Sequence, residues 1–439
     1  MNKIAFHTLG CKVNQVETEG LIDDFTSRGY ELVDFEDVAD IYVINSCTVT
    51  HVSDRKSRAM IRRAVRRNPN ALVVATGCGA QVDAEQLAAI KGVNLVVGNR
   101  DKENLAAIIE DYWRRGRSDS EIFIAPIGSD EKPREILYKY HHQRTRAFVK
   151  IQDGCQSFCS YCIVPMARGP VRSKAPEAVL HEIEQLVYLG YREIVLTGIH
   201  TGFYGVDIPG WNLSRLVAAI LEQIQGSYRI RLSSIEPLEV DENLLEIMAA
   251  DRRICRHLHI PLQSGSDRVL KNMGRRYDRD YYRRLVRSIC DRIPGIAFTA
   301  DVMVGFPGED EDDFRYTHHL IAELPLSDLH VFKYSMRRGT KAALMIPQVP
   351  EPEKNRRSKI LLELAEEKQL EFAKSFIGQR FDLLVERKSG KDSYIGLTDN
   401  YLEVSVQSRQ DLCGQSVEVE IASAQPGIIN GNIRIEKQH

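Results

Sequence analysis

The chain has 439 residues, which is too long for one ordinary domain and suggests about three on length alone. With 43% hydrophobic and 27% charged residues it has the composition of a globular protein, and no apolar run approaches membrane-spanning length. The net charge of -2 excludes a general attraction to nucleic acid, and the polar start does not resemble a signal peptide. We therefore expect a cytoplasmic protein without a membrane partner, whose nine cysteines are ligands or core residues rather than disulfides.

In the first 125 residues, apolar runs alternate with helical periods, which predicts an open parallel sheet with helices on its faces. The expected strands are Ile4 to Leu9, Ile41 to Asn45, Leu72 to Thr76 and Leu95 to Val97. Cys11, Cys47 and Cys78 each follow one of the first three strands. A single such cysteine is usually a small core residue, but the carboxyl ends of parallel strands meet at one edge, where ligands bind. The pattern therefore predicts three thiolates around one iron-sulfur cluster.

The helix expected from Asp54 to Arg67 has a basic face. Arg58, Arg62 and Arg66 share it at helical spacing. A phosphate backbone is the natural partner of such a face, and the alternative is an ordinary solvated helix surface.

Residues from about 127 to 144 show no periodicity and predict a linker. From about 145 to 345, strands and helices alternate for six rounds, which predicts a full or partial β/α barrel with its chemistry at the carboxyl ends of the strands. The expected strands are Ala147 to Ile151, Glu193 to Thr197, Arg229 to Ser233, His257 to Leu262, Phe298 to Val304 and Leu329 to Tyr334.

Three further cysteines, Cys155, Cys159 and Cys162, lie in the loop after the first barrel strand. Three thiolates in one loop can hold a cluster of iron and sulfide, and because a cube of four irons takes four ligands, one iron stays open. A structural zinc ion is normally bound by four protein ligands, and a disulfide in this loop would leave one of the three thiols unpaired, so both alternatives fit less well. We interpret both groups of three cysteines as ligands of [4Fe-4S] clusters with one open iron each.

After a helical connector from Glu353 to Phe376, period-two alternation predicts a small antiparallel β-barrel. Its expected strands are Arg380 to Glu386, Ser393 to Thr398, Tyr401 to Gln407, Ser416 to Ile421 and Ile428 to Ile435. The predicted fold class is therefore α/β with three domains, at residues 1–125, 145–375 and 376–439.

The spacing Cys-x3-Cys-x2-Cys, with Tyr161 before the last cysteine, resembles the radical S-adenosylmethionine (SAM) superfamily. Across the chain the sequence resembles the methylthiotransferases, which join a three-cysteine domain, a radical SAM barrel and an RNA-binding barrel called TRAM. The motifs that carry this resemblance are Gly10-Cys11-Lys12-Val13-Asn14-Gln15, Asn45-Ser46-Cys47-Thr48-Val49, Gly77-Cys78, Pro261-Leu262-Gln263-Ser264-Gly265-Ser266 and Val304-Gly305-Phe306-Pro307-Gly308-Glu309.

The resemblance implies insertion of a methylthio group at a carbon-hydrogen bond, with two [4Fe-4S] clusters and two SAM molecules per turnover. One SAM would methylate a sulfur held by the Cys11 set, and the other would yield a 5'-deoxyadenosyl radical that abstracts hydrogen from the substrate. No side chain is then needed as acid or base. The SAM contacts that the resemblance implies are Tyr161, Gly198, Ser233, Glu236, Gln263 and Gly305.

The motif around Cys11 is closest to the bacterial branch that modifies N6-threonylcarbamoyladenosine at position 37 of tRNA, giving its 2-methylthio derivative. Other targets of the family are isopentenyl-adenosine in tRNA and a ribosomal-protein aspartate, and an RNA-binding iron-sulfur sensor is the non-enzymatic alternative. The threonyl carboxylate would need a cation, for which Arg337 or Arg338 is the candidate. The expected partners are tRNA, a reductant such as flavodoxin or ferredoxin, and a sulfur donor of unknown nature, and we expect a monomer.

Overall fold

The computed structural model describes residues 2–116, 119–128 and 145–434. Its contacts divide the chain into two compact units. The first unit comprises Met1–Tyr140, Gln152–Lys174 and Ser335–Leu344, and the second comprises His141–Ile151, Ala175–Tyr334 and Met345–His439. Both groups of three cysteines therefore belong to the first unit. The expected linker lies mostly outside the described residues, and the three domain boundaries stay a prediction.

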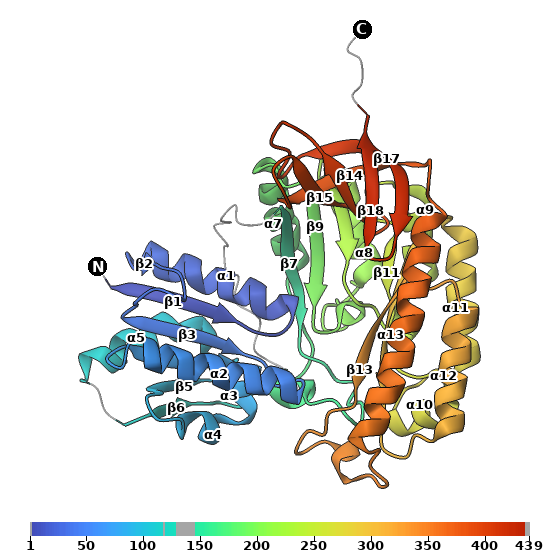
Figure 1. Cartoon of the computed structure of the whole chain (residues 1–439). Coiled ribbons are helices and arrows are strands. Elements are labelled where there is room, and N and C mark those ends of the chain that lie inside the picture. Colours follow the sequence, from blue (N-terminus) through green and yellow to red (C-terminus); the bar gives the residue numbers. More distant parts are fainter. Residues whose placement is uncertain (1, 117–118, 129–144, 435–439) are drawn as a thin grey trace. The chain divides into compact units, whose positions relative to one another are not determined.

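The first unit contains a parallel sheet of the order β2-β1-β3-β4-β5-β6 (Figure 1). Its strands are β1 (Lys3–Thr8), β2 (Glu31–Leu32), β3 (Ile41–Ser46), β4 (Leu72–Gly77), β5 (Leu95–Val97) and β6 (Glu121–Phe123). Every residue of β3 and β4 is buried, as expected for central strands covered on both faces. The predicted open parallel sheet is confirmed, and the short edge strands β2 and β6 were not predicted.

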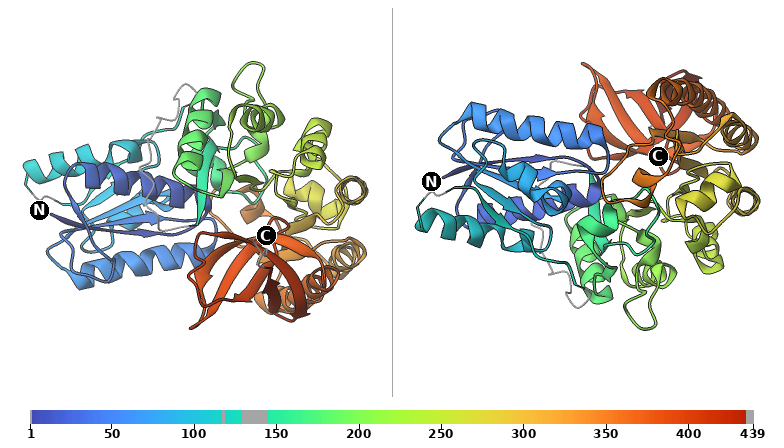
Figure 2. Two further views of the ribbon diagram at one scale, coloured as in Figure 1. Left: turned by 90° about the horizontal axis from the view of Figure 1, so that it is seen from above. Right: turned by 90° about the horizontal axis from the view of Figure 1, so that it is seen from below.

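Helices cover both faces of this sheet (Figure 2). On one face, Phe25 and Ile109 of α1 and α5 pack with the strand residues Ile4 and Val43. On the other, Ile61 of α2 packs with other strand residues. The helices are α1 (Lys12–Ser27), α2 (His51–Arg67), α3 (Cys78–Val82), α4 (Ala84–Ala88) and α5 (Leu105–Arg114), with a 3-10 turn at Asp101–Asn104. The unit also holds α6 (Val164–Arg168), β8 (Arg172–Ser173), which pairs with the last two residues of β7, and a 3-10 turn at Lys341–Leu344.

The second unit contains the predicted partial β/α barrel. Neighbouring strands are arranged as β10-β9-β7 and as β11-β12-β13. An isolated parallel bridge joins Ile230 of β10 to Ile254, which precedes β11. The strands are β7 (Arg146–Asp153), β9 (Glu193–Gly198), β10 (Arg229–Leu232), β11 (His257–His259), β12 (Ala297–Val304) and β13 (Asp328–Lys333). The helices are α7 (Pro176–Tyr188), α8 (Leu213–Gln223), α9 (Glu242–Ala250), α10 (Asp267–Met273), α11 (Arg279–Arg292), α12 (Glu311–Glu323) and α13 (Glu351–Lys374), with 3-10 turns at Thr201–Phe203 and Pro237–Glu239.

The chain then forms a closed five-stranded barrel of the order β14-β15-β16-β18-β17. Its strands are β14 (Arg380–Lys388), β15 (Ser393–Thr398), β16 (Glu403–Gln407), β17 (Ser416–Gln425) and β18 (Ile428–Ile433). The pairs are antiparallel except that β16 and β18 meet in parallel. The predicted small barrel is thus confirmed.

Buried charges join this barrel to the β/α barrel within the second unit. Arg229 donates from Nη2 to the carbonyl oxygen of Leu397 (2.7 Å), and Arg231 donates from Nη2 to that of Thr398 (3.0 Å). Glu193, which has no exposed surface, accepts from Nε of both arginines, at 2.6 and 2.7 Å. The carboxylate thus holds both guanidinium groups toward the C-terminal barrel. None of the helices in the described part of the chain is long and apolar enough to cross a membrane.

Candidate functional site

Three thiols meet at one edge of the sheet in the first unit. Cys11 is the N-cap residue of α1, Cys47 follows β3, and Cys78 is the first residue of α3. Since β1, β3 and β4 are neighbouring parallel strands, all three cysteines lie at the same edge. Cys11 is exposed, whereas Cys47 and Cys78 are buried. Burial raises the pKa of the Cys47 thiol, and the nearby thiols of Cys78 and Cys11 raise it further.

Two residues around Cys11 hold these cysteine loops together. Asn14 donates from Nδ2 to the carbonyl oxygen of Leu9 (2.8 Å), shortly before Cys11, and to that of Ser46 (3.3 Å), the last residue of β3 and directly before Cys47. Gly10 has a φ of +101°, and a Cβ there would lie 2.9 Å from Cβ of Cys47. The glycine and asparagine of the first cysteine motif therefore serve the close approach of the two loops.

The second set of thiols, Cys155, Cys159 and Cys162, lies in a loop of fixed backbone shape. Gly154 has a φ of +75°, which favours glycine, and the N–H of Cys155 donates to the carbonyl oxygen of Gly169 (3.0 Å). The N–H of Cys162 donates to the carbonyl oxygen of Cys159 (3.0 Å). All three cysteines are partly exposed. The loop thus presents its sulfur atoms without a disulfide.

One buried arginine connects the two sets. Arg168 has no exposed surface and donates from Nη1 to Glu17 of α1 (2.6 Å) and to Asp153 at the end of β7 (3.0 Å). Its Nη2 donates to Asn14, and its Nε lies 3.4 Å from Sγ of Cys78. Asp153 stands two residues before Cys155. Arg168 therefore contacts a cysteine of the first set and the strand that leads into the second.

Two further basic residues contact the carboxylates that pair with Arg168. Lys102, also buried, donates from Nζ to Glu17 (2.6 Å), and Arg172 lies 3.4 Å from Asp153. Among the described residues, Arg168, Lys102 and Arg172 thus contact these two carboxylates. Burial opposes the charge of Arg168, but Asp153, Cys78 and Glu17 together raise its pKa well above the ordinary value.

Comparison with known proteins identifies the chain. Residues 3–98 match the model of the Uncharacterized protein family UPF0004, and residues 149–321 match that of the Radical SAM superfamily. The chain is 42% identical, over 97% of its length and 94% of the relative, to the threonylcarbamoyladenosine tRNA methylthiotransferase MtaB of Bacillus subtilis (strain 168). The chain belongs to the radical SAM methylthiotransferase family. The enzyme of the same name from Aquifex aeolicus (strain VF5) is 41% identical, over 95% of this chain and 100% of the relative.

Other methylthiotransferases and a more distant fold relative also match. The tRNA-2-methylthio-N(6)-dimethylallyladenosine synthase of Carboxydothermus hydrogenoformans is 35% identical, over 94% of this chain and 95% of the relative. A solved structure, the radical S-adenosylmethionine methyltransferase TsrM of Kitasatospora setae, has a TM-score of 0.57 at 16% identity and covers 76% of this chain and 72% of that chain. At this identity the likeness concerns the fold alone.

The two sets of thiols in this methylthiotransferase suit iron-sulfur clusters. None of the nine cysteines is joined to another by a disulfide in the structure. Hydrogen-bond donors approach the sulfur atoms, which is usual for cluster thiolates: Asn99 Nδ2 lies 3.7 Å from Sγ of Cys78, and the N–H of Ser157 lies 3.5 Å from Sγ of Cys155. The chemistry and placement of the donors therefore fit the expected groups.

Four of the residues expected to contact SAM lie at carboxyl ends of barrel strands in the second unit. Gly198 ends β9, Ser233 follows β10, and Gly305 follows β12. Gln263 lies beyond β11 and has a φ of +63°. The hydroxyl of Ser233 is buried and has no hydrogen-bond partner among the described residues, so a polar group of a ligand would satisfy it. Tyr161, in the first unit, is partly exposed.

Glu236 and the Gly305 loop are held by basic residues. Glu236 accepts from Arg275 Nη1 at 2.5 Å. The N–H of Gly305 donates to the carboxylate of Glu309 (2.9 Å), which also accepts from Arg357 of α13 (2.6 Å). Burial raises the pKa of Glu309, which opposes its charge, whereas Arg357 favours it.

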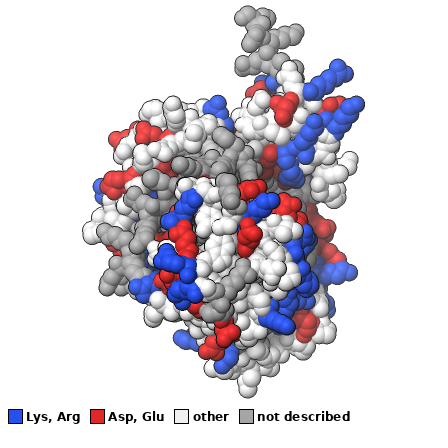
Figure 3. All heavy atoms as spheres, turned by 90° about the vertical axis from the view of Figure 1, so that its left-hand side faces the viewer, with Lys and Arg blue, Asp and Glu red and all other residues white. Residues whose placement is uncertain are grey.

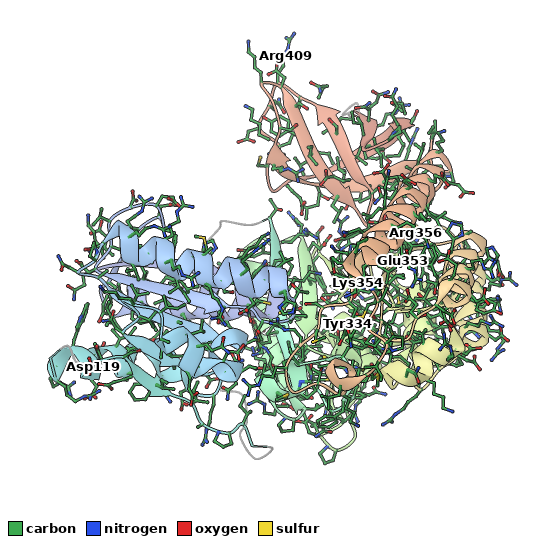
Figure 4. The ribbon with its side chains drawn as sticks, turned by 60° about the horizontal axis from the view of Figure 1, so that its bottom comes forward. Asp119, Tyr334, Glu353, Lys354, Arg356 and Arg409 are labelled. Carbon is green, nitrogen blue, oxygen red and sulfur yellow. The ribbon has the colours of Figure 1, made fainter. Side chains whose placement is uncertain are left out.

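Helix α13 therefore does more than connect two domains. Its Lys354 lies close to Tyr334, and both residues are labelled in Figure 4. Nζ of Lys354 lies 5.3 Å from the ring centroid of Tyr334 and donates to the Tyr334 carbonyl oxygen (3.1 Å). Through Lys354 and Arg357, one helix fixes the backbone that follows β12 and β13. The sequence indicated the helix but gave no sign of this role.

Of the two arginines proposed for the substrate carboxylate, one is engaged with the protein. Arg337 is 7% exposed and donates from Nη2 to the carbonyl and hydroxyl oxygens of Thr48, while its Nη1 lies 3.2 Å from Nδ1 of His51. Arg338 is exposed. The structure thus makes Arg337 a support for the loop next to Cys47 and leaves Arg338 accessible.

The basic helix α2 has the predicted stripe of arginines. Arg62 and Arg66 are exposed, whereas Arg58 is half-buried and pairs with Asp54 (3.4 Å). On the face of the molecule in Figure 3, basic and acidic side chains are interspersed, in keeping with the small net charge. The stripe on α2 is therefore a local feature.

The sequence did not indicate Arg168, Glu17 or Lys102, because charged residues are normally exposed. One signal was available. Arg168 ends the otherwise apolar stretch Ile163-Val164-Pro165-Met166-Ala167, where a cation needs buried partners.

Proposed function

We propose that this protein attaches a methylthio group to carbon 2 of N6-threonylcarbamoyladenosine at position 37 of tRNA. The product is 2-methylthio-N6-threonylcarbamoyladenosine, and the enzyme is a radical SAM transferase. The observation that carries the proposal is the pair of three-thiol sets joined by Arg168, since a single-cluster enzyme has no use for Cys11, Cys47 and Cys78 at one sheet edge. The choice of this nucleoside rests on the relatives at 41 and 42% identity.

The cofactors are two [4Fe-4S] clusters and SAM. In our proposal Cys11, Cys47 and Cys78 hold one cluster, and Cys155, Cys159 and Cys162 hold the other. Bound there, the clusters supply the electron for SAM cleavage and a site for the transferred sulfur. The chain orients these groups. Arg168 donates from Nε toward Sγ of Cys78 and holds α1 to the end of β7, and the backbone of the Cys155 loop sets the directions of its sulfur atoms.

The SAM contacts remain those expected from the resemblance. Ser233 supports this assignment through its buried, unpaired hydroxyl, and Gly305 through the rigid loop that Glu309 closes. Glu236 is held in position for a polar contact by its ion pair with Arg275. Gly198 and Gln263 would contact SAM through backbone groups at the strand ends, and Tyr161 would contact it through its ring.

For the substrate, we assign the threonyl carboxylate to Arg338 and a supporting role to Arg337. An exposed guanidinium can form two parallel hydrogen bonds to a carboxylate, and this one is not held by an ion pair in the described part of the chain. Arg62 and Arg66 would contact tRNA phosphates, with Arg58 held more firmly by Asp54.

The remaining assignments follow from this reaction. A TRAM domain at 376–439 would bind RNA, next to a radical SAM domain at 145–375 and a three-cysteine domain at 1–125. The enzyme would work as a monomer in the cytoplasm, where tRNA is found, with flavodoxin or ferredoxin as electron donor and a separate sulfur donor.

Mass analysis of tRNA nucleosides tests the reaction directly. A strain that lacks this gene should lose the methylthio derivative and accumulate N6-threonylcarbamoyladenosine, and the wild-type gene should restore it. If the strain keeps 2-methylthio-N6-threonylcarbamoyladenosine but loses the methylthio group from isopentenyl-adenosine or from a ribosomal-protein aspartate, the enzyme acts on that other target instead.

Cysteine variants separate the two clusters. Reconstituted wild-type protein should hold about eight irons and Cys78→Ala about four. With reductant and SAM under anaerobic conditions, Cys78→Ala should still form 5'-deoxyadenosine but no methylthio product, whereas Cys159→Ala should form neither. Cys255→Ala, at a buried cysteine outside both sets, is the matched control. An RNA-binding sensor would form no 5'-deoxyadenosine in any of these proteins.

A further inference from the structure

A cleft rich in arginine lies in the second unit, away from the loops assigned to SAM. Its volume is about 810 Å³. The cleft is lined by Arg192, Arg229, Arg252, Arg253, Arg256 and Arg380, together with the two aspartates Asp382 and Asp399 and neutral residues.

The arginines come from the amino ends of strands. Arg192 directly precedes β9, Arg229 begins β10, and Arg256 directly precedes β11. The opposite wall is the C-terminal barrel, to which Arg380 at the start of β14 belongs. Since Gly198, Ser233 and Gly305 lie at carboxyl strand ends, the cleft is at the other end of the β/α barrel from them.

Two of the six guanidinium groups are ion-paired within the protein. Arg229 pairs with Glu193 at 2.6 Å and with Asp382 of the cleft at 3.8 Å, and Arg253 pairs with Asp251 at 2.7 Å. These ion pairs belong to the framework of the cleft.

The other four keep their charge. Arg192 donates from Nη1 to the carbonyl oxygen of Ser227 (3.0 Å), and Arg256 donates from Nη1 to that of Pro294 (3.0 Å). These hydrogen bonds hold each guanidinium group in place without neutralising its charge. Arg252 and Arg380 are exposed. Over residues 2–116, 119–128 and 145–434, none of these four has a carboxylate within ion-pair distance. These four cations thus share the cleft with Asp399 and with Asp382, which already pairs with Arg229.

Such an arrangement costs folding energy unless an anion is bound, because like charges that share a cleft repel each other. Guanidinium groups bind phosphate through paired hydrogen bonds, and several of them along a groove fit a ligand with regularly spaced phosphates. We propose that this cleft binds the sugar-phosphate backbone of the tRNA substrate. The proposal rests on the proposed function for the identity of the RNA, and it adds a contact at the amino ends of the barrel strands.

The test uses the double variant Arg252→Ala/Arg380→Ala in the cluster-loaded enzyme. Both side chains are exposed and make no ion pair in the described part of the chain, so the fold should survive, which circular dichroism checks. The matched control is Lys271→Ala/Arg284→Ala, which removes the same charge from exposed positions of α10 and α11 that lie outside the cleft and make no ion pair in the described part of the chain.

Affinity for tRNA is measured between about 50 and 200 mM salt, where each phosphate contact contributes about 0.7 to 0.9 to the slope of log K against log salt. The cleft variant should lower that slope by about 1.4 to 1.8, and the control by less. The rate at saturating tRNA and the formation of 5'-deoxyadenosine should stay unchanged. A second readout is stability: inorganic phosphate should raise the Tm of the wild type more than that of the cleft variant.

An unchanged slope and affinity in the cleft variant would overturn the proposal, even if the wild type modifies tRNA normally. A reduced phosphate effect on Tm without any change in tRNA binding would also overturn it, because the cleft would then be a site for small anions. If the slope falls as expected but the wild type modifies no tRNA, the cleft remains an RNA site and the proposed reaction fails. The two proposals are thus tested separately.

Discussion

Replacing Glu193 with glutamine keeps the size of the side chain but removes the buried charge that holds Arg229 and Arg231. Burial favours the neutral acid, but Arg231 and Arg229 outweigh it and lower the pKa of Glu193 from 4.5 to about 2. At about 1.4 kcal/mol per pKa unit, this difference corresponds to ~3 kcal/mol of stability. Breaking a buried ion pair by removing one partner costs about 3–5 kcal/mol, which is the same range.

The same reasoning fixes the sign of the pH dependence. A carboxylate whose pKa is lowered on folding stabilises the native state above its unfolded pKa and loses this contribution as the pH falls. The stabilisation by Glu193 is therefore complete above about pH 4.5 and declines toward pH 2. Glu193→Gln should be about 3 kcal/mol less stable than the wild type at pH 7, and the difference should shrink toward pH 2.

Urea unfolding of the two cluster-free proteins at several pH values measures this difference, and hydrogen exchange of peptides covering β9 and β10 locates it. Glu222→Gln, at an exposed residue of α8, serves as the control and should change neither. A difference below about 1 kcal/mol at pH 7, or one that stays constant between pH 5 and pH 2, would refute the role assigned to the buried carboxylate.

Two further substitutions probe the cysteine edge and the SAM loops. Gly77→Ala should lower Tm and iron content sharply, because the added Cβ would lie 2.3 Å from Oδ1 of Asn45. The control Gly29→Ala, at a residue with a similar φ of +86° and open space around it, should cost only about 1 kcal/mol of stability. Equal effects of the two substitutions would contradict the steric argument. Arg357→Met leaves the buried Glu309 carboxylate without its cation and should weaken SAM binding in equilibrium dialysis, whereas an affinity equal to that of the wild type would show that the loop after β12 does not need this pair.

The sequence predicted the structure best where a hydrophobic pattern is compatible with only one kind of secondary structure. The buried strands β3 and β4 are continuous apolar runs, and the structure has them within one residue of the prediction. The edge strands β2 and β6 have two and three residues, which is too short for a period to show. The strand predicted from His257 to Leu262 ends at His259 as β11, since Pro261 lacks an N–H and Gln263 has a positive φ.

For the site, local patterns located the cysteines but not the residues between them. A thiol directly after a parallel strand has a predictable position, which is why Cys11, Cys47 and Cys78 could be placed at one edge from the sequence. Arg168, Glu17 and Asp153 lie in three distant segments, and each resembles a surface residue when read alone. Their pairing depends on tertiary contacts that no periodicity encodes.

Arg168 also has a mechanical consequence for the enzyme. A rigid fork of hydrogen bonds joins the helix behind Cys11, the thiol of Cys78 and the strand end before Cys155, so the gap between the two sulfur-bearing regions cannot widen without breaking buried ion pairs. The separation of the two groups of cysteines is therefore imposed by the folded chain itself, through one buried side chain.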